Sequence, residues 1–194
     1  MPIEVPSHIK GLVFDLDGTI ADTMPAHYKA WVAALGEHGV ELPEQQFYAF
    51  GGMPTPRIIE LLNDQHDKSM PVMETALRKE ALFEAYIPAV RPIGAIVDLI
   101  ERFHGKLPMA VATGGMRFVA TKTLEALHLL DRFDAFVTVE DVRRGKPAPD
   151  TFLEAARRIN VPPGECMAFE DADLGVESAT AAGMLVLDVR TLGL

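Results

Sequence analysis

Short apolar runs that stop abruptly at polar residues recur along this chain, and stretches of helical periodicity separate them. Runs of this kind are typical of buried parallel strands, which are apolar on both faces. We expect five strands, over residues 9–14, 107–112, 135–139, 167–169 and 184–189. Helices are expected over residues 93–104, 116–128, 150–159 and 173–182. The alternation of strand and helix predicts an α/β fold with a doubly wound, Rossmann-like parallel sheet.

One long segment interrupts this alternation directly after the first expected strand. It contains no convincing strand pattern, and helices are expected there over residues 24–38, 44–50, 56–65 and 71–86. Thr55 is the predicted N-cap of the third helix, with Pro56 at its first position. We therefore expect a Rossmann-like catalytic core formed by residues 1–22 and 89–194, with an inserted α-helical cap domain over residues 23–88. The hinges are expected at Thr19–Met24 and Ile87–Pro92.

The charge balance limits the partners of such a protein. The chain has 18 Lys and Arg residues against 28 Asp and Glu residues, so its net charge is −10. No cluster of basic residues is longer than a pair, and we expect neither a nucleic-acid partner nor a membrane surface. No apolar run reaches the 18 or so residues that cross a bilayer. The single cysteine, Cys166, fits a reducing compartment, and the N-terminus lacks a signal-peptide pattern. A monomeric cytoplasmic protein is expected.

Polar residues follow four of the expected strands. Asp15-Leu16-Asp17-Gly18-Thr19 comes after the first, Thr113-Gly114-Gly115 after the second, and Glu170-Asp171 after the fourth. The loop after the third strand carries Lys146. Open α/β sheets bind their ligands at the carboxyl ends of the strands. We therefore expect carboxylates, a hydroxyl and one ammonium group to meet at one edge of the sheet.

These groups have the chemistry of phosphoryl transfer. Crowded carboxylates with no His or Cys ligand nearby favour a hard cation, and Mg²⁺ is the usual one in phosphoryl chemistry. A carboxylate such as Asp15 can attack phosphorus and form an aspartyl phosphate. A second one two residues later, Asp17, can act as general acid. Thr113 can donate to a phosphoryl oxygen, and Lys146 can neutralise charge shared by the phosphate and Asp15.

The four segments resemble motifs I to IV of the haloacid dehalogenase superfamily, and the helical insertion resembles its class I cap. The stretches Asp15–Ile20, His27–Trp31 and Lys146–Asp150 are similar to the β-phosphoglucomutase-like branch. The segment from Asp171 to Arg190 is similar to the bacterial fructose-1-phosphate phosphatases. The resemblance covers essentially the whole chain. It implies a Mg²⁺-dependent phosphatase of small sugar phosphates that acts through an aspartyl-phosphate intermediate.

The same resemblance implies a role for each matched residue. Asp15 would be the nucleophile, and Asp17 the general acid and later the base for water. Mg²⁺ would be held by the Asp15 carboxylate, the Asp17 main-chain carbonyl and Asp171. Glu170 would lie behind these ligands or bind through water. The phosphate clamp of the family falls on Thr113, the backbone of Gly114, and Lys146.

Three residues of the expected cap are candidates for contact with the substrate. His27 stands where mutase-like relatives place a histidine facing the site, and packing beside Trp31 is an equally good interpretation. Arg57 and Lys79 lie on expected cap helices and could grip a sugar or its phosphate. Charged residues on a helix usually face solvent, so this is the bolder of two interpretations.

Three alternative functions fit the sequence less well than a phosphatase does. A β-phosphoglucomutase-type phosphomutase would share the first half-reaction, but mutases carry a serine and a lysine after the second motif and an arginine in the cap. Gly115, Met116 and Thr55 stand at those positions here. A signalling receiver domain would leave Asp17 and the helical insertion without a purpose. Dinucleotide binding is disfavoured because the chain has no GxGxxG motif. A phosphatase is the first choice and a mutase the second.

Overall fold

Five parallel strands form the central sheet of the computed structural model, which describes residues 2–193. The strand order is β5-β4-β1-β6-β7. Their bounds are β1 Gly11–Phe14, β4 Met109–Ala112, β5 Ala135–Val137, β6 Cys166–Glu170 and β7 Leu185–Asp188. The chain runs outward from β1 through β4 to β5, and then returns to the other side of β1 for β6 and β7. This order confirms the predicted doubly wound sheet and places its switch point between β1 and β6.

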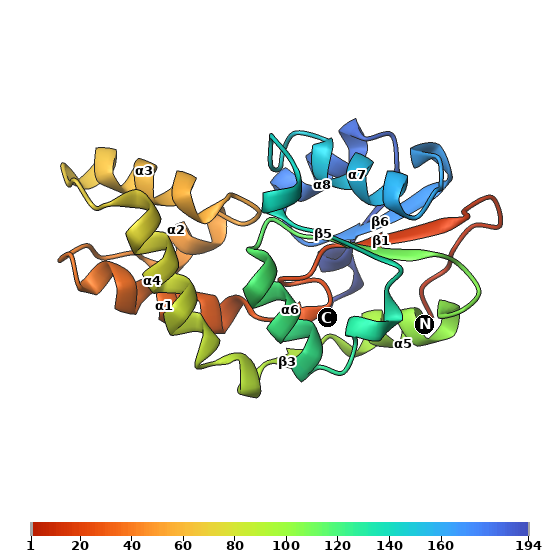
Figure 1. Ribbon diagram of the computed structural model, residues 1–194, viewed down its shortest axis with the longest axis horizontal. Helices are drawn as coiled ribbons and strands as arrows, with labels where there is room; N and C mark the ends of the chain where they lie inside the picture. Colours follow the sequence, from red (N-terminus) through yellow and green to blue (C-terminus); the bar gives the residue numbers. More distant parts are fainter. Residues whose placement is uncertain (1, 194) are drawn as a thin grey trace.

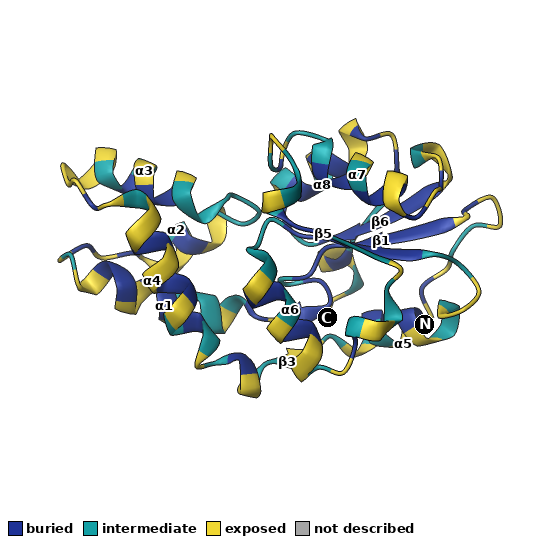
Figure 2. Ribbon diagram, viewed as in Figure 1, coloured by how far each residue is buried: buried dark blue, intermediate teal, exposed yellow. Residues whose placement is uncertain are grey.

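Helices cover both faces of the sheet. α5 (Gly94–Phe103) and α6 (Arg117–Ala126) lie on one side, while α7 (Asp150–Arg158) and α8 (Asp173–Ala181) lie on the other (Figure 1). Successive side chains of β1 point to opposite layers: Leu12 and Phe14 pack in one apolar cluster, and Val13 packs in the other. Every residue of the inner strands β1, β4 and β6 is therefore buried (Figure 2), which explains why these strands are apolar without alternation.

Four helices between β1 and α5 form a separate group beside the carboxyl ends of the strands (Figure 1). They are α1 (Met24–Gly36), α2 (Glu44–Ala49), α3 (Thr55–His66) and α4 (Val72–Glu84). We call these four helices the helical insertion. Its members bury an apolar cluster of their own, which includes Trp31, Leu35, Phe47, Ile59 and Leu62. The insertion was expected from the sequence, and the domain boundaries at residues 23 and 88 stay a prediction.

Two features of the insertion differ from expectation. The predicted hinges contain a short antiparallel ribbon of β2 (Ala21–Asp22) and β3 (Arg91–Pro92), which pairs the two ends of the insertion. The predicted N-cap at Thr55 is wrong, because α3 begins at Thr55 and Pro54 precedes it as the cap residue. The Thr55 hydroxyl donates instead to Glu80 on α4.

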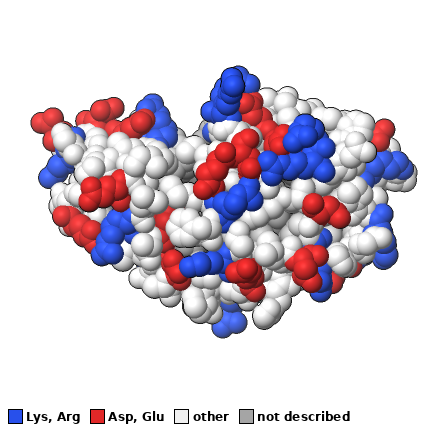
Figure 3. Space-filling model, viewed as in Figure 1, with Lys and Arg blue, Asp and Glu red and all other residues white. Residues whose placement is uncertain are grey.

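The remaining regular elements are short 3₁₀ turns. They are η1 Ile87–Ala89, η2 Leu130–Arg132, η3 Val139–Asp141, η4 Pro163–Glu165 and η5 Val189–Leu192. Within the described residues, no helix has the length and hydropathy needed to pass through a bilayer. On the face shown in Figure 3, Lys and Arg side chains lie interspersed with Asp and Glu.

Candidate active site

The loop after β1 carries the first two predicted catalytic residues. The backbone N–H of Asp15 still donates to the Phe169 carbonyl of β6, at 3.0 Å, so Asp15 is held at the end of the sheet. The chain then turns at Gly18, whose φ is +88°. A Cβ atom at Gly18 would lie only 2.1 Å from Asp171 Oδ2. Glycine is thus needed here both for the backbone conformation and for the close approach of the loop after β6.

Lys146 joins two of the carboxylates. Its Nζ lies 2.6 Å from Asp15 Oδ1 and 2.5 Å from Glu170 Oε1, and its side chain is only 1% exposed. Burial lowers the pKa of Lys146, but Asp15 and Glu170 outweigh it and hold this pKa above its ordinary value. The pKa of Asp15 is raised well above its ordinary value by burial and by the neighbouring carboxylates, despite Lys146. One ammonium group therefore does not neutralise this cluster.

Asp15, Glu170 and Asp171 each offer one oxygen, and the three oxygens lie within 4.8 Å of one another. Burial and Glu170 raise the pKa of Asp171 to about 7. The two oxygens of Glu170 already accept hydrogen bonds, Oε1 from Lys146 and Oε2 from the Ala172 N–H at 2.8 Å. An all-oxygen set with uncompensated negative charge fits a hard divalent cation. The side chain of Asp17 does not belong to this set of three.

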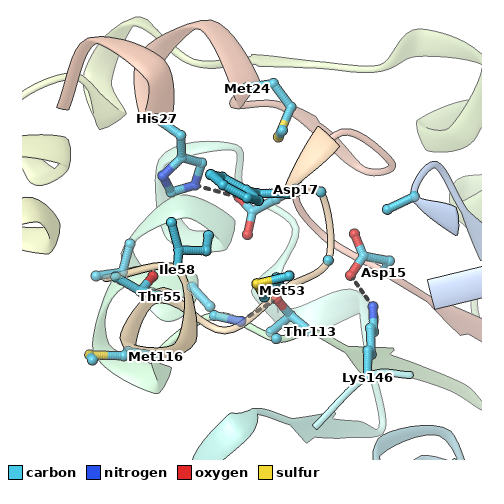
Figure 4. Close-up of a pocket in the computed structure, with 18 of the residues that line it drawn as sticks. Asp15, Asp17, Met24, His27, Met53, Thr55, Ile58, Thr113, Met116 and Lys146 are labelled. Atoms are coloured by element: carbon cyan, nitrogen blue, oxygen red, sulfur yellow. Dashed lines mark hydrogen bonds and ion pairs between the residues drawn. The ribbon is translucent and has the colours of Figure 1, made fainter. Parts of the chain in front are cut away.

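Asp17 instead faces the helical insertion. Its Oδ1 accepts from the Thr23 hydroxyl at 2.7 Å. The same oxygen lies 3.1 Å from His27 Nε2 (Figure 4). Burial raises the pKa of Asp17, but the charge of His27 and the hydrogen bonds of His27 and Thr23 outweigh it and lower this pKa to about 2. His27 stacks on Phe83 with a centroid distance of 3.8 Å, and its Nδ1 lies 2.8 Å from Lys79 Nζ. Asp17 is thus an ionised carboxylate positioned by helices α1 and α4.

The loop after β4 completes the edge of the sheet. Thr113 is buried, and its Oγ1 accepts from the Gly115 N–H at 2.9 Å. A Cβ at Gly115 would lie 3.3 Å from Thr113 Oγ1 and 3.5 Å from Asp17 Oδ2. The gap between Thr113, Gly115 and Asp17 is therefore narrow. Thr113, Gly114 and Lys146 line the same pocket as Asp15 and Asp17. The structure therefore brings together every core residue that the sequence singled out.

Known proteins are similar to this chain over most of its length. The family profile of the haloacid dehalogenase-like hydrolases matches residues 9–183. The chain belongs to this family. It is 43% identical over 183 residues to the fructose-1-phosphate phosphatase YqaB of Escherichia coli (strain K12), covering 94% of this chain and 97% of that protein. It is 33% identical over 181 residues to hexitol phosphatase A of the same organism, covering 93% and 83%.

Solved structures agree with the assignment of the fold. A β-phosphoglucomutase from Clostridium difficile superposes with a TM-score of 0.84 over 95% of this chain and 87% of that one, at 23% identity. At that identity the likeness establishes the fold alone. The family match and the phosphatase relatives confirm two predictions: the resemblance to the superfamily, and an enzyme of the phosphatase class.

The pocket of this hydrolase lies between the strand ends and the helical insertion. His27 and Lys79 line it, as two of the three predicted cap residues. Arg57 is not among the lining residues; its guanidinium pairs with Glu60 at 2.9 Å and its side chain is 56% exposed. Apolar side chains form much of the wall: Met24, Trp31, Phe47, Phe50, Met53, Ile58, Met116 and Val119. Glu80 also lines the pocket, and sequence reasoning missed it.

Proposed function

We propose that this hydrolase is a Mg²⁺-dependent phosphatase of small sugar phosphates similar to fructose 1-phosphate. The observation that carries the proposal is the buried cluster of Asp15, Lys146, Glu170 and Asp171 at the strand ends, with Thr113 beside it. The choice of ester rests on the relative named a fructose-1-phosphate phosphatase, at 43% identity. The pocket above the cluster offers room for the sugar between the core and the helical insertion.

Asp15 acts as the nucleophile in this proposal. Its carboxylate attacks phosphorus, the bond from phosphorus to the sugar oxygen breaks, and an aspartyl phosphate forms. Asp17 gives a proton to the leaving sugar oxygen and later takes one from the water that hydrolyses the intermediate. The ionised state of Asp17 suits the second step. An arriving phosphate, itself negative, raises the pKa of a neighbouring carboxyl and thereby favours the protonated form that the first step needs.

Mg²⁺ would be held by Asp15, Asp171 and the Asp17 main-chain carbonyl, with Glu170 behind them. When bound, the ion would offset the negative charge that the phosphoryl group shares with these carboxylates. Lys146 neutralises part of the same charge from the side of Glu170. The Thr113 hydroxyl and the Gly114 N–H are assigned to the phosphoryl oxygens. His27 and Lys79 position Asp17 from the insertion.

Water, rather than a second substrate hydroxyl, is the acceptor in this proposal. A mutase has to hold the distal phosphate of a bisphosphate intermediate, and Gly115 and Met116 provide no cation for it. Thr55 replaces the arginine of the mutases, and the guanidinium of Arg57 pairs with Glu60 at the surface. Charge-assisted hydrogen bonds to phosphate are about twice as strong as neutral ones, so their absence favours hydrolysis.

The test is phosphate release from fructose 1-phosphate with Mg²⁺, after chelation, and in Asp15→Asn. We expect Asp15→Asn to lower kcat at least about 10³-fold, because it removes the phosphoryl acceptor. Chelation should abolish turnover, because it removes the cation that supports this acceptor electrostatically. Asp98→Asn, on the exposed side of α5, is the matched control and should retain full activity. Turnover that survives chelation or Asp15→Asn would contradict the mechanism.

A second arm separates the phosphatase from the mutase. β-Glucose 1-phosphate is supplied with a bisphosphate primer and Mg²⁺, and the products are followed by phosphorus NMR. Inorganic phosphate is the expected product. A dominant glucose 6-phosphate signal would establish the mutase instead. The predictions of a monomer and of a cytoplasmic location are separate from this test and stay predictions.

A further inference from the structure

Glu80 is a buried carboxylate in the pocket that the mechanism above does not use. Its side chain is only 5% exposed, and it lines the same pocket as Asp15 and Asp17. The buried side of α4 consists of Thr75, Ala76, Lys79, Glu80 and Phe83. Lys79 and Glu80 are thus charged residues at positions of the buried face where apolar side chains are usual. A buried ion pair such as Lys79–Glu80 is weak evidence of stabilisation, because the cost of desolvating both charges can exceed their attraction. A functional reason for Glu80 should therefore be sought.

Among residues 2–193, donors reach one oxygen of this carboxylate. Oε1 accepts from the Thr55 hydroxyl at 3.2 Å and from Lys79 Nζ at 3.0 Å. No donor from residues 2–193 reaches Oε2 within hydrogen-bond distance. Nor is Oε2 among the fully enclosed side-chain atoms without a partner, which are Thr75 Oγ1 and Arg102 Nε in the described part of the chain. Oε2 therefore remains accessible as an acceptor for a group in the pocket.

Glu80 and Thr55 lie where the leaving group of a bound phosphate ester would be expected. Thr55 lies beside Ile58 and Met116, at the side of the pocket away from Asp15 and Lys146 (Figure 4). A phosphate held at Asp15 would direct the rest of the ester toward Thr55. Lys79 offers no unpaired positive charge there, because its ammonium group pairs with Glu80 at 3.0 Å.

We propose that Glu80 and Thr55 form a subsite that binds hydroxyl groups of an uncharged polyol leaving group and rejects esters with a second phosphate. This inference rests on the proposed phosphatase function and adds its specificity. Hydrogen bonds from hydroxyls to a carboxylate are charge-assisted and short. A second phosphate would find no unpaired cation there among the described residues, because Lys79 is already paired with Glu80 at 3.0 Å, and its charge would be desolvated without compensation. A site that depends on hydrogen bonds to substrate hydroxyls also rejects esters that lack them.

The experiment measures kcat/KM for fructose 1-phosphate, 4-nitrophenyl phosphate and fructose 1,6-bisphosphate in the Mg²⁺-loaded protein. In Glu80→Gln, the ratio of kcat/KM for fructose 1-phosphate to that for 4-nitrophenyl phosphate should fall up to about tenfold, because the amide oxygen still accepts a hydrogen bond but without the charge assistance of the carboxylate. The ratio of the bisphosphate to fructose 1-phosphate should rise. Glu74→Gln, on the exposed side of the same helix, is the matched control and should change neither ratio.

A second pair of variants tests the hydroxyl. Thr55→Val should lower the ratio of kcat/KM for fructose 1-phosphate to that for 4-nitrophenyl phosphate severalfold. Thr55→Ser, which keeps the hydroxyl, should retain the wild-type ratio. This pair decides the question if Glu80→Gln fails to fold, as checked by thermal unfolding. Equal losses for all three esters would show that Glu80 acts only through Lys79, His27 and Asp17, and would overturn the subsite. Unchanged ratios in an active protein would overturn it as well.

The same measurements distinguish a failure of the Glu80–Thr55 subsite from a failure of the proposed phosphatase function. A wild-type protein that releases no phosphate from any of the three esters overturns the proposed phosphatase, and the subsite with it. An active wild type whose ratios are insensitive to Glu80 and Thr55 overturns the subsite alone.

Discussion

Glu170 reaches Lys146 because residue 175 is a glycine. A Cβ atom at Gly175 would lie 1.8 Å from Glu170 Oε1 and 2.0 Å from its Cδ. The Glu170 side chain therefore occupies the space directly beside the first turn of α8. The absence of a side chain at Gly175 thus leaves the space that the Lys146–Glu170 ion pair needs.

Gly175→Ala should accordingly destabilise the protein and lower its activity. Overpacking a buried site typically costs about 1–3 kcal/mol of unfolding free energy, and the carboxylate displaced here pairs with Lys146. Chemical denaturation and phosphate release would measure the two effects. Gly94→Ala is the control, because a Cβ there meets nothing within 4 Å and alanine restricts the unfolded chain, which stabilises by about 0.4–1 kcal/mol. Equal stability of the two variants would contradict the explanation.

The residues at strand ends could be predicted from the sequence, and Glu80 could not. Parallel strands bring their carboxyl ends to one edge, so Asp15, Thr113 and Asp171 were found without knowledge of any contact. Glu80 lies on a helix, where a charged residue ordinarily faces solvent. The signal that could have revealed it is its register, because it follows Thr75 and Ala76 at helical spacing on the buried stripe.

At the scale of elements, Arg158 ties α7 to its surroundings, and Glu154 on the same helix holds that arginine in place. This carboxylate accepts from Arg157 and Arg158 at 2.7 Å, and Arg158 also donates to Asp141 and to the Phe136 carbonyl of β5. The hydrogen bond from Arg157 is the main cause that lowers the pKa of Glu154 to about 2, from an ordinary value of 4.5.

The stabilisation from Glu154 should therefore depend on pH. The folded pKa lies below the unfolded one, so the contribution is fully present above about pH 4.5 and is lost as pH falls toward 2. Because the arginines are solvated, Glu154→Gln should cost about 0.5–1 kcal/mol at pH 7 and nearly nothing at pH 2. Denaturation curves at both pH values measure this difference. Glu125→Gln, an exposed residue of α6, should show no such trend; a pH-independent loss in Glu154→Gln would refute the linkage.

The helices and the main strands were predictable because their apolar periodicity extends over several residues. The β2–β3 ribbon was not, because each strand has two residues and no periodicity can be recognised in so few. The error at Thr55 has a similar origin. Thr-Pro is a common helix start, but Pro54 takes the cap position and the Thr55 hydroxyl bonds to Glu80, a contact that only tertiary structure supplies.

At the scale of the whole molecule, the two parts of the chain divide the proposed work. The sheet and its loops hold Asp15, Lys146 and Asp171, whereas the insertion supplies His27 and Lys79 to Asp17 and Glu80 to the pocket. The loop between α2 and α3 packs against the core: a Cβ at Gly52 would lie 3.4 Å from Ala172 Cβ. The pocket is thus closed by contact between the two parts.

Replacing residues 24–88 with a short Gly/Ser linker should leave a folded core that hydrolyses phosphate esters without selecting among them. The linker can be short because Asp22 pairs with Arg91 across the ribbon, so the two ends of the deletion already lie side by side. The nucleophile and the predicted metal ligands all stay in the chain. The ratio of kcat/KM for fructose 1-phosphate to that for 4-nitrophenyl phosphate should fall at least about tenfold, because the hydrogen-bonding groups of the insertion are absent.

The deletion exposes Val119, which packs against Ala30, Phe83 and Ile87 in the intact protein. Val119→Ser in the shortened chain should therefore improve its solubility, and circular dichroism should confirm the fold before any rate is compared. The full-length protein with Val119→Ser is the matched control for the substitution itself. A shortened chain that folds and still prefers fructose 1-phosphate to the same degree would mean that the core alone selects the ester, and that the insertion serves another purpose.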